Sequence, residues 1–407
     1  MLAIFVRFVY NGYNLFILKK SVAAVYARSA VEFEMDIPII SIIIPTYRCA
    51  ERLQLLMDCL TAQTFGFEKL EVLFADDCSP DDTGRVIDSL SARFSNVSAL
   101  HLPANSGFAG APRNAAIHAA HAPYLMFLDA DDLLPPNACQ TLYDGLLKTD
   151  ADLVTGYCRY VDENGGVLQE ILPAYAELHP RITHLPEELS DELLMRDSFW
   201  CRLYKSNIVS ENGLFFPTGV PGEDIFFLYS YLLCCRSAAY LAQHVYDYYS
   251  CNASVTHNRS SGYYIGLGDC YRKIQTLFEK AGQPALFSLV ADHILEFHLC
   301  GMMDSACMTE ADIATALPAW GWLFQYETAQ GTLDDSPLAD ALAPLVSAEC
   351  WDTAAHTLRL CAPLRTALER SRAETEQWKK HAFAFQKTVT DMRNSRSWRI
   401  THLFSKG

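Results

Sequence analysis

Short apolar runs alternate with helical patterns along the first half of the chain. The runs are continuous and mostly aliphatic, which indicates strands that are covered on both faces. They lie at residues 39–44, 70–75, 97–102, 124–128 and 152–160. Segments between them place apolar side chains three and four residues apart, as amphipathic helices do. These segments lie at residues 51–64, 83–94 and 112–122. Strands that alternate with helices predict an α/β fold with a mostly parallel sheet.

The pattern changes near residue 260, where strand signals fade and helical periodicity takes over. The chain ends in a stretch with ten Lys or Arg and four Asp or Glu. We therefore predict an N-terminal extension at 1–36, an α/β domain at 37–258, a helical C-terminal region at 259–364 and a basic helical tail at 365–407. For the extension, a plain helix and a membrane-surface anchor are the alternatives. For the tail, they are a solvated helix and contact with anionic lipid headgroups.

Charge and cysteine usage narrow the class of protein. The 407 residues carry a formal net charge of −16, which argues against nucleic-acid binding because phosphate contacts need a basic surface. The 14 cysteines include no C-x-x-C pair and no zinc-like cluster. We therefore expect a reducing, cytoplasmic environment, with peripheral attachment to the inner face of the cell membrane as the further option.

Acidic residues cluster where predicted strands end or shortly before a long apolar run. In open α/β sheets, ligands bind outside the carboxyl ends of the strands. Each pair alone is also typical of turns and helix caps, so only the combination points to a site. The acids are Asp76, Asp77, Asp129, Asp131, Asp132, Glu223 and Asp224.

Three of these carboxylates, Asp129, Asp131 and Asp132, lie within four residues. Carboxylate oxygens suit Mg²⁺ or Mn²⁺ that is also held by substrate phosphates. Like charges this close repel, so their pKa values should rise without a cation. The spacing therefore predicts a divalent metal, which would neutralise charge on a leaving diphosphate.

Five segments in this order resemble family 2 glycosyltransferases. They read SIIIPTYR at 41–48, EVLFADDCSPDDT at 71–83, NSGFAGAPRN at 105–114, YLMFLDADD at 124–132 and GED at 222–224. The resemblance spans about residues 37–256. It implies the GT-A fold, in which a Rossmann-like nucleotide-binding half merges with an acceptor-binding half. The chain departs from the family at Arg48, where Asn is frequent, and at Cys78, where Gly is frequent.

The resemblance also implies roles at the donor site. The nucleotide pocket would be lined by Pro45, Thr46 and Tyr47. Asp77 would accept a hydrogen bond from the base, commonly uracil, while Asp76 supports its loop. Arg113 and Asn114 would lie near the nucleotide or the sugar. Asp129 and Asp131 would be the D-x-D pair that contacts the ribose and the metal. Asp132 would share the metal.

On the acceptor side, Asp224 would be the general base that takes the proton of the attacking hydroxyl. Direct displacement at the anomeric carbon would invert its configuration. Trp200, Arg202 and Glu223 would face the acceptor; for Trp200, a core packing role is the equal alternative. His257 would be a metal or phosphate ligand, against the alternative of a structural histidine.

Together these features predict an inverting, metal-dependent glycosyltransferase of bacterial surface-polysaccharide synthesis. Its partners would be a nucleotide-sugar donor, for which a UDP-sugar is favoured, and a glycan or lipid-linked glycan acceptor. A nicotinamide-dependent oxidoreductase is disfavoured, because the turn after the first strand has no G-x-G-x-x-G. A Mg²⁺-dependent nucleotidyl- or phosphoryl-transfer enzyme and a catalytically inactive glycan-binding scaffold remain as alternatives.

Overall fold

The computed structural model describes residues 38–162, 165–171, 181–184, 199–249, 259–305, 307–331 and 337–363. These residues form two compact units, one up to Tyr249 and one from Arg259 onward. The N-terminal extension, the basic tail and His257 lie outside the described residues.

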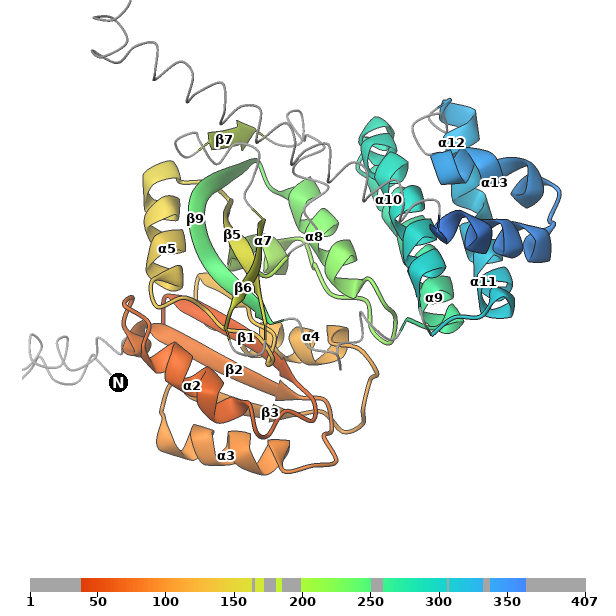
Figure 1. Ribbon diagram of the computed structural model, residues 1–407. Coiled ribbons are helices and arrows are strands. Elements are labelled where there is room, and N and C mark those ends of the chain that lie inside the picture. Colours follow the sequence, from red (N-terminus) through yellow and green to blue (C-terminus); the bar gives the residue numbers. More distant parts are fainter. Residues whose placement is uncertain are drawn as a thin grey trace, which may run out of the picture. The chain divides into compact units, whose positions relative to one another are not determined.

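The first unit is built on one large sheet (Figure 1). Its strands are β1 (Ile40–Thr46), β2 (Leu70–Asp76), β3 (Val97–His101), β4 (Tyr124–Phe127), β5 (Leu153–Val161), β6 (Val167–Ile171), β7 (Arg181–His184), β8 (Arg202–Lys205) and β9 (Ser237–Tyr249). They run in the order β3-β2-β1-β4-β8-β5-β9-β7, and β6 pairs with β5.

The first four strands are parallel, as the sequence predicts. β2 is buried along its whole length and β1 along nearly all of it, which explains their continuous apolar runs. The helices that follow are α2 (Leu53–Thr61), η1 (Phe67–Lys69), α3 (Thr83–Arg93) and α4 (Gly110–Ala119). α4 packs against β1 and β2, and α3 against β3.

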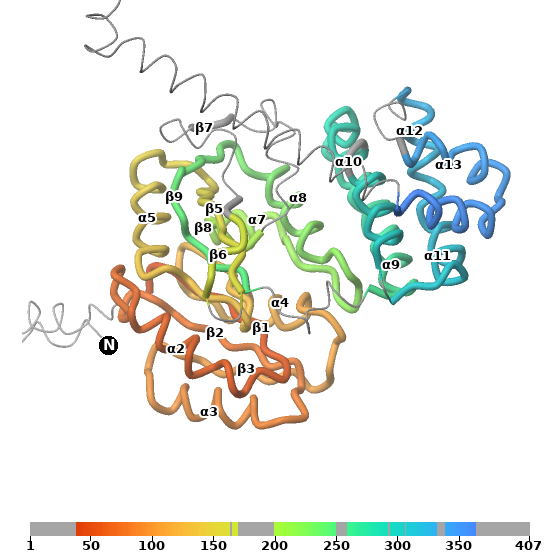
Figure 2. The backbone as a smooth tube through the Cα atoms, viewed as in Figure 1, coloured from red at the N-terminus to blue at the C-terminus, as the bar shows by residue number. Residues whose placement is uncertain are grey.

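The rest of the sheet is mixed, whereas the sequence predicts a mostly parallel one. The pairs β4–β8, β5–β8, β5–β6 and β7–β9 are antiparallel, and β5–β9 is parallel. Antiparallel neighbours need no crossover helix, so the strand–helix alternation that reveals the first half is missing here. Figure 2, coloured along the chain, shows the red and orange early strands together and the yellow and green later strands together.

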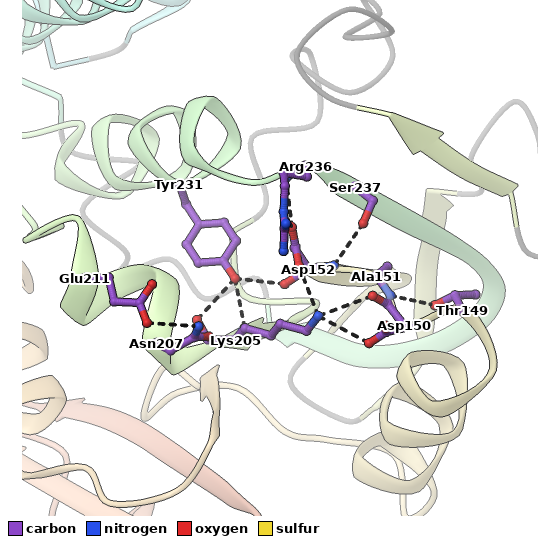
Figure 3. A network of polar contacts seen from close by, with 10 residues as sticks. All are labelled: Thr149, Asp150, Ala151, Asp152, Lys205, Asn207, Glu211, Tyr231, Arg236 and Ser237. Carbon is purple, nitrogen blue, oxygen red and sulfur yellow. Dashed lines mark hydrogen bonds and ion pairs between the residues drawn. The ribbon is translucent and has the colours of Figure 1, made fainter.

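Among its described residues the first unit has three further helices: α5 (Ala138–Thr149), α7 (Ser206–Glu211) and α8 (Glu223–Cys234). α8 is anchored to the sheet near its carboxyl end by the network in Figure 3. The Tyr231 hydroxyl donates to the Asp152 carbonyl oxygen at 2.8 Å and accepts from the Lys205 N–H at 2.8 Å. The buried Asp152 carboxylate accepts from Lys205 Nζ at 3.0 Å and from the Arg236 N–H at 2.8 Å. The network therefore ties α8 to β5, β8 and the start of β9.

The second unit is helical, as predicted. It contains α9 (Ser261–Lys280), α10 (Pro284–Asp304), α11 (Glu310–Ala316), η3 (Leu317–Trp320), α12 (Gly321–Gln330) and α13 (Pro337–Ser347), and residues 351–363 are helical too. Trp320 is fully buried, and its indole N–H donates to the Tyr264 carbonyl oxygen at 3.0 Å. This bond satisfies the one polar atom of a large core side chain.

Helix α10 is long and apolar enough to cross a membrane, judged by length and composition alone. Over that window, 56% is buried inside the protein. Among its buried side chains are Val290, Leu295, Leu299 and Met302, all at 0% exposure. The core of the helical unit therefore accounts for the apolar character of α10.

Candidate active site

The predicted acids gather at one edge of the sheet. β2, β1 and β4 are adjacent and parallel, so their carboxyl ends meet there. Thr46 ends β1 opposite Asp76, which ends β2, and the Asp77 N–H donates to the Thr46 carbonyl oxygen at 2.9 Å. Asp129 follows β4 by two residues. This is the edge at which open α/β sheets bind ligands.

Asp77 organises the loop beside the ends of β1 and β2. The residue is 4% exposed. Its carboxylate accepts from the Ser106 N–H at 3.0 Å and from Asn105 Nδ2 at 3.0 Å. The first segment of the NSGFAGAPRN motif is therefore held by the same carboxylate that the resemblance assigns to the nucleotide base.

Asp76 supports the neighbouring loop. It accepts a hydrogen bond from the Ser79 hydroxyl at 2.5 Å, and Ser79 Oγ accepts from the Arg48 N–H at 3.1 Å. Arg48 and Cys78 both have left-handed backbones, with φ of 52° and 57°. Asn and Gly adopt this conformation more readily than other residues, which explains why those types are frequent in the family at these two positions. Pro45 lies within β1, and Tyr47 is 42% exposed at its end.

The acidic turn after β4 holds its three carboxylates in different environments. Asp131 is exposed, the Asp129 side chain is 26% exposed, and Asp132 is only 1% exposed. Both Asp132 oxygens are engaged inside the protein, by the Tyr246 hydroxyl at 2.7 Å and the Tyr249 N–H at 2.8 Å. Burial, and then the charges of Asp131 and Asp129, raise the pKa of Asp132 well above its usual range.

The pKa of Asp131 is also raised, although its side chain reaches solvent. The protein surrounding it removes part of its hydration, and Asp129 adds repulsion. Arg52 opposes this shift and holds the turn, since its guanidinium donates to the Asp131 carbonyl oxygen at 2.6 Å. The same guanidinium lies 5.3 Å from the centre of the Tyr249 ring.

The donor set fits a hard divalent cation that is shared with a substrate. Asp131 and Asp129 present carboxylate oxygens, the ligands that Mg²⁺ and Mn²⁺ prefer. Within the described ranges, no three His, Cys, Asp or Glu residues are grouped so that they alone could hold an ion. A cation here would take its remaining ligands from phosphate oxygens or water.

Arg113 joins the acidic turn to the start of α8. Its guanidinium donates to Asp129 Oδ1 at 2.7 Å and to Glu223 Oε1 at 3.1 Å. The side chain is 5% exposed and packs against two aromatic rings, 4.4 Å from the centre of Phe199 and 5.3 Å from that of Phe216. The carboxylates around it raise its pKa despite the opposing effect of burial. Arg113 therefore stays charged between two carboxylates.

Asn114 clamps the segment that leads to α8. Its Nδ2 donates to the Phe216 carbonyl oxygen at 2.7 Å, and its Oδ1 accepts from the Phe216 N–H at 2.9 Å. α4 and this segment approach so closely that a Cβ at Gly110 would lie 2.2 Å from the Pro217 carbonyl oxygen. These contacts place Asn114 against the protein backbone, whereas the resemblance assigns it to the donor.

Glu223 and Asp224 open α8 directly after Gly222, whose φ of 79° suits a glycine. Glu223 is 7% exposed, and burial, followed by repulsion from Asp224, raises its pKa to about 7. The pKa of Asp224 is raised as well, mainly by burial. Arg113 lowers both values. The raised pKa values of both carboxyls make them better proton acceptors than ordinary acids, which suits a general base.

The acceptor-side residues of the first prediction are mostly interior. Arg202 is 1% exposed and Trp200 is 8% exposed. The Trp200 ring stacks on Tyr246 with ring centres 4.4 Å apart and on Tyr248 at 5.6 Å. For Trp200, the packing alternative agrees with this placement.

Three residues with clear roles in this geometry were missed from sequence. Arg52 holds the main chain of Asp131, Tyr246 contacts the acidic turn, and Phe216 stacks on Phe227 at 4.1 Å beneath Arg113. The only sequence signal was the alternation of Tyr246 and Tyr248 in β9, which is also typical of core packing.

The sequence model of the family described as "Glycosyl transferase family 2" matches residues 41–212. A poly(ribitol-phosphate) beta-glucosyltransferase of Bacillus spizizenii is 28% identical over 52% of this chain and 32% of its own length. The uncharacterized glycosyltransferase YibD of Escherichia coli is 27% identical over 64% of this chain and 75% of its own.

Solved structures show the same fold. The crystal structure of S. aureus TarS 1–349 in complex with UDP-GlcNAc superposes with a TM-score of 0.61 at 19% identity. The match covers 80% of this chain and 92% of that one. The first unit therefore has the GT-A fold. The chain spans only about a third of the length of the Bacillus relative.

Proposed function

Because residues 41–212 are a family 2 glycosyltransferase domain, we propose that the chain is an inverting glycosyltransferase. It moves a sugar from a nucleotide-sugar donor, by preference a UDP-sugar, to a hydroxyl of a glycan or lipid-linked glycan in cell-surface polysaccharide synthesis. The observation that carries this proposal is the Arg113 bridge. It brings the D-x-D carboxylate Asp129 and the first residue of α8 into one cluster at the ligand-binding edge of the sheet.

The donor nucleotide is proposed to lie over the ends of β1 and β2. Pro45, Thr46 and Tyr47 line this pocket, and Asp77 accepts a hydrogen bond from the base through a lone pair that its loop contacts leave available. Support comes from TarS, which binds UDP and UDP-GlcNAc on the same fold. The ribose is proposed to lie against Asp129.

A divalent cation, Mn²⁺ or Mg²⁺, is proposed at Asp131 and Asp129. When bound, it supplies Lewis-acid stabilisation of the negative charge on the leaving diphosphate. Asp131 offers its exposed carboxylate, and Asp129 keeps Oδ2 for ribose or metal while Oδ1 binds Arg113. His257 remains a proposed further ligand that lies outside the described residues.

Asp224 is proposed as the general base. The acceptor oxygen attacks the anomeric carbon, the bond from that carbon to the diphosphate breaks, and the acceptor proton passes to the Asp224 carboxylate. Glu223 stays beside it, bound to Arg113, and sets the local charge. Attack opposite the leaving group gives inversion.

The acceptor is proposed to be a hydroxyl-bearing polymer or its lipid-linked precursor, at the cytoplasmic face of the membrane. Several relatives are named as poly(ribitol-phosphate) glycosyltransferases, so a polyol-phosphate chain is one acceptor to include in assays.

The test is a thermal-shift screen against nucleotide sugars with and without Mn²⁺, followed by turnover with the donor that binds. We expect one donor to stabilise the wild-type protein only with metal. Asp131→Ala should abolish that shift, and Asp224→Asn should bind donor but lose turnover. Donor binding without any transfer to a panel of acceptors would favour the scaffold alternative. Stabilisation by nucleoside triphosphates alone would favour nucleotidyl transfer.

A further inference from the structure

The third acid of the turn, Asp132, faces into the protein. It is 1% exposed, and each of its oxygens accepts a hydrogen bond from β9. A buried carboxylate is costly unless its acceptors are satisfied, so these bonds explain how the protein tolerates it. Both of these hydrogen bonds come from β9 and not from the loop that carries Asp132.

Tyr246 is the centre of this arrangement. Its phenol oxygen donates to Asp132 Oδ2 at 2.7 Å and accepts from the Asp129 N–H at 3.2 Å. One fully buried hydroxyl therefore contacts both Asp129, the first residue of the D-x-D pair, and Asp132, which follows Asp131. The Asp132 N–H closes the turn on the Asp129 carbonyl oxygen at 3.1 Å.

The turn and the end of β9 are joined at one further pair of residues, and the Tyr246 ring is held by a neighbouring aromatic side chain. Leu133 and Asp247 exchange backbone hydrogen bonds of 3.2 and 2.9 Å. The Trp200 ring stacks on Tyr246 at 4.4 Å with an angle of 20°, which fixes the orientation of the phenol. Packing of the ring therefore sets the position of the hydroxyl.

We propose that Tyr246 and Asp132 are positioning residues that hold the Asp129 and Asp131 carboxylates in the geometry needed for the metal and the donor. Asp132 is in this view a partner of β9 and not a metal ligand. Tyr246 acts through the backbone of Asp129 and through Asp132. This inference rests on the proposed function, because it concerns the same metal and donor.

An apolar pair in this space would remove the acceptors that the N–H groups of Asp129 and Tyr249 have here. A buried donor left without an acceptor costs about 1–3 kcal/mol. The network does what packing alone cannot, since it fixes one N–H and one carboxylate of a short acidic turn. Outer-shell hydrogen bonds of this kind typically change metal affinity or activity by about 10–100-fold when removed.

The test compares Tyr246→Phe with Tyr231→Phe. Both tyrosines are fully buried and both hydroxyls make hydrogen bonds to the backbone, but Tyr231 belongs to the network of Figure 3. Calorimetry would measure UDP binding at increasing Mn²⁺ and in its absence, and melting curves would check that each variant is folded.

We expect Tyr246→Phe to raise the Mn²⁺ concentration for half-maximal UDP binding by roughly 10–100-fold. The weak UDP binding that remains without metal should stay close to that of the wild type, because the nucleotide pocket on β1 and β2 is untouched. Tyr231→Phe should melt at lower temperature with unchanged Mn²⁺ dependence. Asp132→Asn should raise the Mn²⁺ concentration for half-maximal UDP binding less than Asp132→Ala does, since the amide oxygen can still accept one of the two hydrogen bonds.

Two results would overturn this inference and leave the proposed function standing. One is an Mn²⁺ dependence of UDP binding in Tyr246→Phe that equals that of the wild type. The other is a loss of Mn²⁺-dependent binding in Tyr231→Phe as large as in Tyr246→Phe. In a third such result, Asp132→Asn would lose Mn²⁺-dependent UDP binding as completely as Asp131→Asn, while Tyr246→Phe behaves as wild type. Asp132 would then bind the metal directly. Absence of Mn²⁺-dependent nucleotide binding in the wild-type protein would instead overturn the proposed function, and this inference with it.

Discussion

Replacing Arg113 with methionine removes the charge that joins the acidic turn to α8. Methionine keeps a flexible apolar side chain against the rings of Phe199 and Phe216, so the change is mainly electrostatic. Two carboxylates lose their partner, Glu223 at 10% side-chain exposure and Asp129 at 26%.

The expected cost follows from these exposures. Breaking a buried ion pair by removing one partner costs about 3–5 kcal/mol, and the pair with Glu223 is of this kind. The contact with Asp129 adds less, because water screens a partly exposed pair. A loss of about 4 kcal/mol should lower the melting temperature of a domain this size by about 8–16 °C.

The loss should depend on pH. Burial already raises the pKa of Glu223 to about 7, and Arg113 opposes that rise. A carboxyl whose folded pKa is raised favours the folded state at low pH, and this contribution is lost as the pH rises through the folded pKa. Without Arg113 the folded pKa moves higher still, so the difference between Arg113→Met and wild type should grow as the pH rises above 7.

Calorimetric melting at pH 6 and pH 9 would measure this difference. The matched control is Arg113→Met in a Glu223→Gln background, where the acid is already neutral. There we expect a smaller cost, as a double-mutant cycle reports for groups in direct contact. An equal cost at both pH values, or in both backgrounds, would refute the electrostatic reasoning.

Three further changes test other contacts. Glu71→Gln should destabilise the protein by about 2 kcal/mol at pH 7, because hydrogen bonds to Glu71 lower its pKa. The difference in unfolding free energy between Glu71→Gln and wild type should shrink as the pH falls below 4.5, the ordinary pKa of a glutamate. A difference that stays constant in denaturation experiments would contradict this explanation. Asn114→Ala should cost about 1–3 kcal/mol and lower kcat more than donor affinity, since the clamped Phe216 segment leads to the proposed base; equal effects on both would contradict it. Arg359→Met should lower the melting temperature of the helical unit by removing the guanidinium that donates to the Met303 carbonyl oxygen near the end of α10, at 2.6 Å; unchanged melting by circular dichroism would count against this cap.

The parallel half of the sheet follows from the sequence because β1, β2 and most of β4 are buried, whereas β3 at the edge of the sheet is only partly buried. β1 and β2 read as apolar runs ended by turn residues, and the structure places them as neighbours in register. The boundaries shift slightly, since β1 continues through Pro45 to Thr46. α4 begins at Gly110, two residues before the predicted start.

The mixed half could not be predicted with the same ease. β8 has four residues and lies between β4 and β5, far from both in the chain. Long-range pairing of such a short strand leaves no periodicity to detect. Likewise, the acidic residues of the site could be listed from the sequence. Which carboxylate is exposed, which is bound by Arg113 and which is buried depends on contacts with α4 and β9, and these contacts cannot be predicted from the sequence.

Calorimetric titration of the wild-type protein and Asp131→Asn with UDP-sugars, with and without Mn²⁺, tests whether Asp131 and Asp129 bind a nucleotide sugar through a divalent cation. We expect metal-dependent binding of at least one donor to the wild-type protein, worth about 2.7 kcal/mol of stabilisation at a hundred times Kd, and its loss in Asp131→Asn. Binding that is equally tight without metal, or unchanged in the variant, would show that these carboxylates do not hold the donor through a cation.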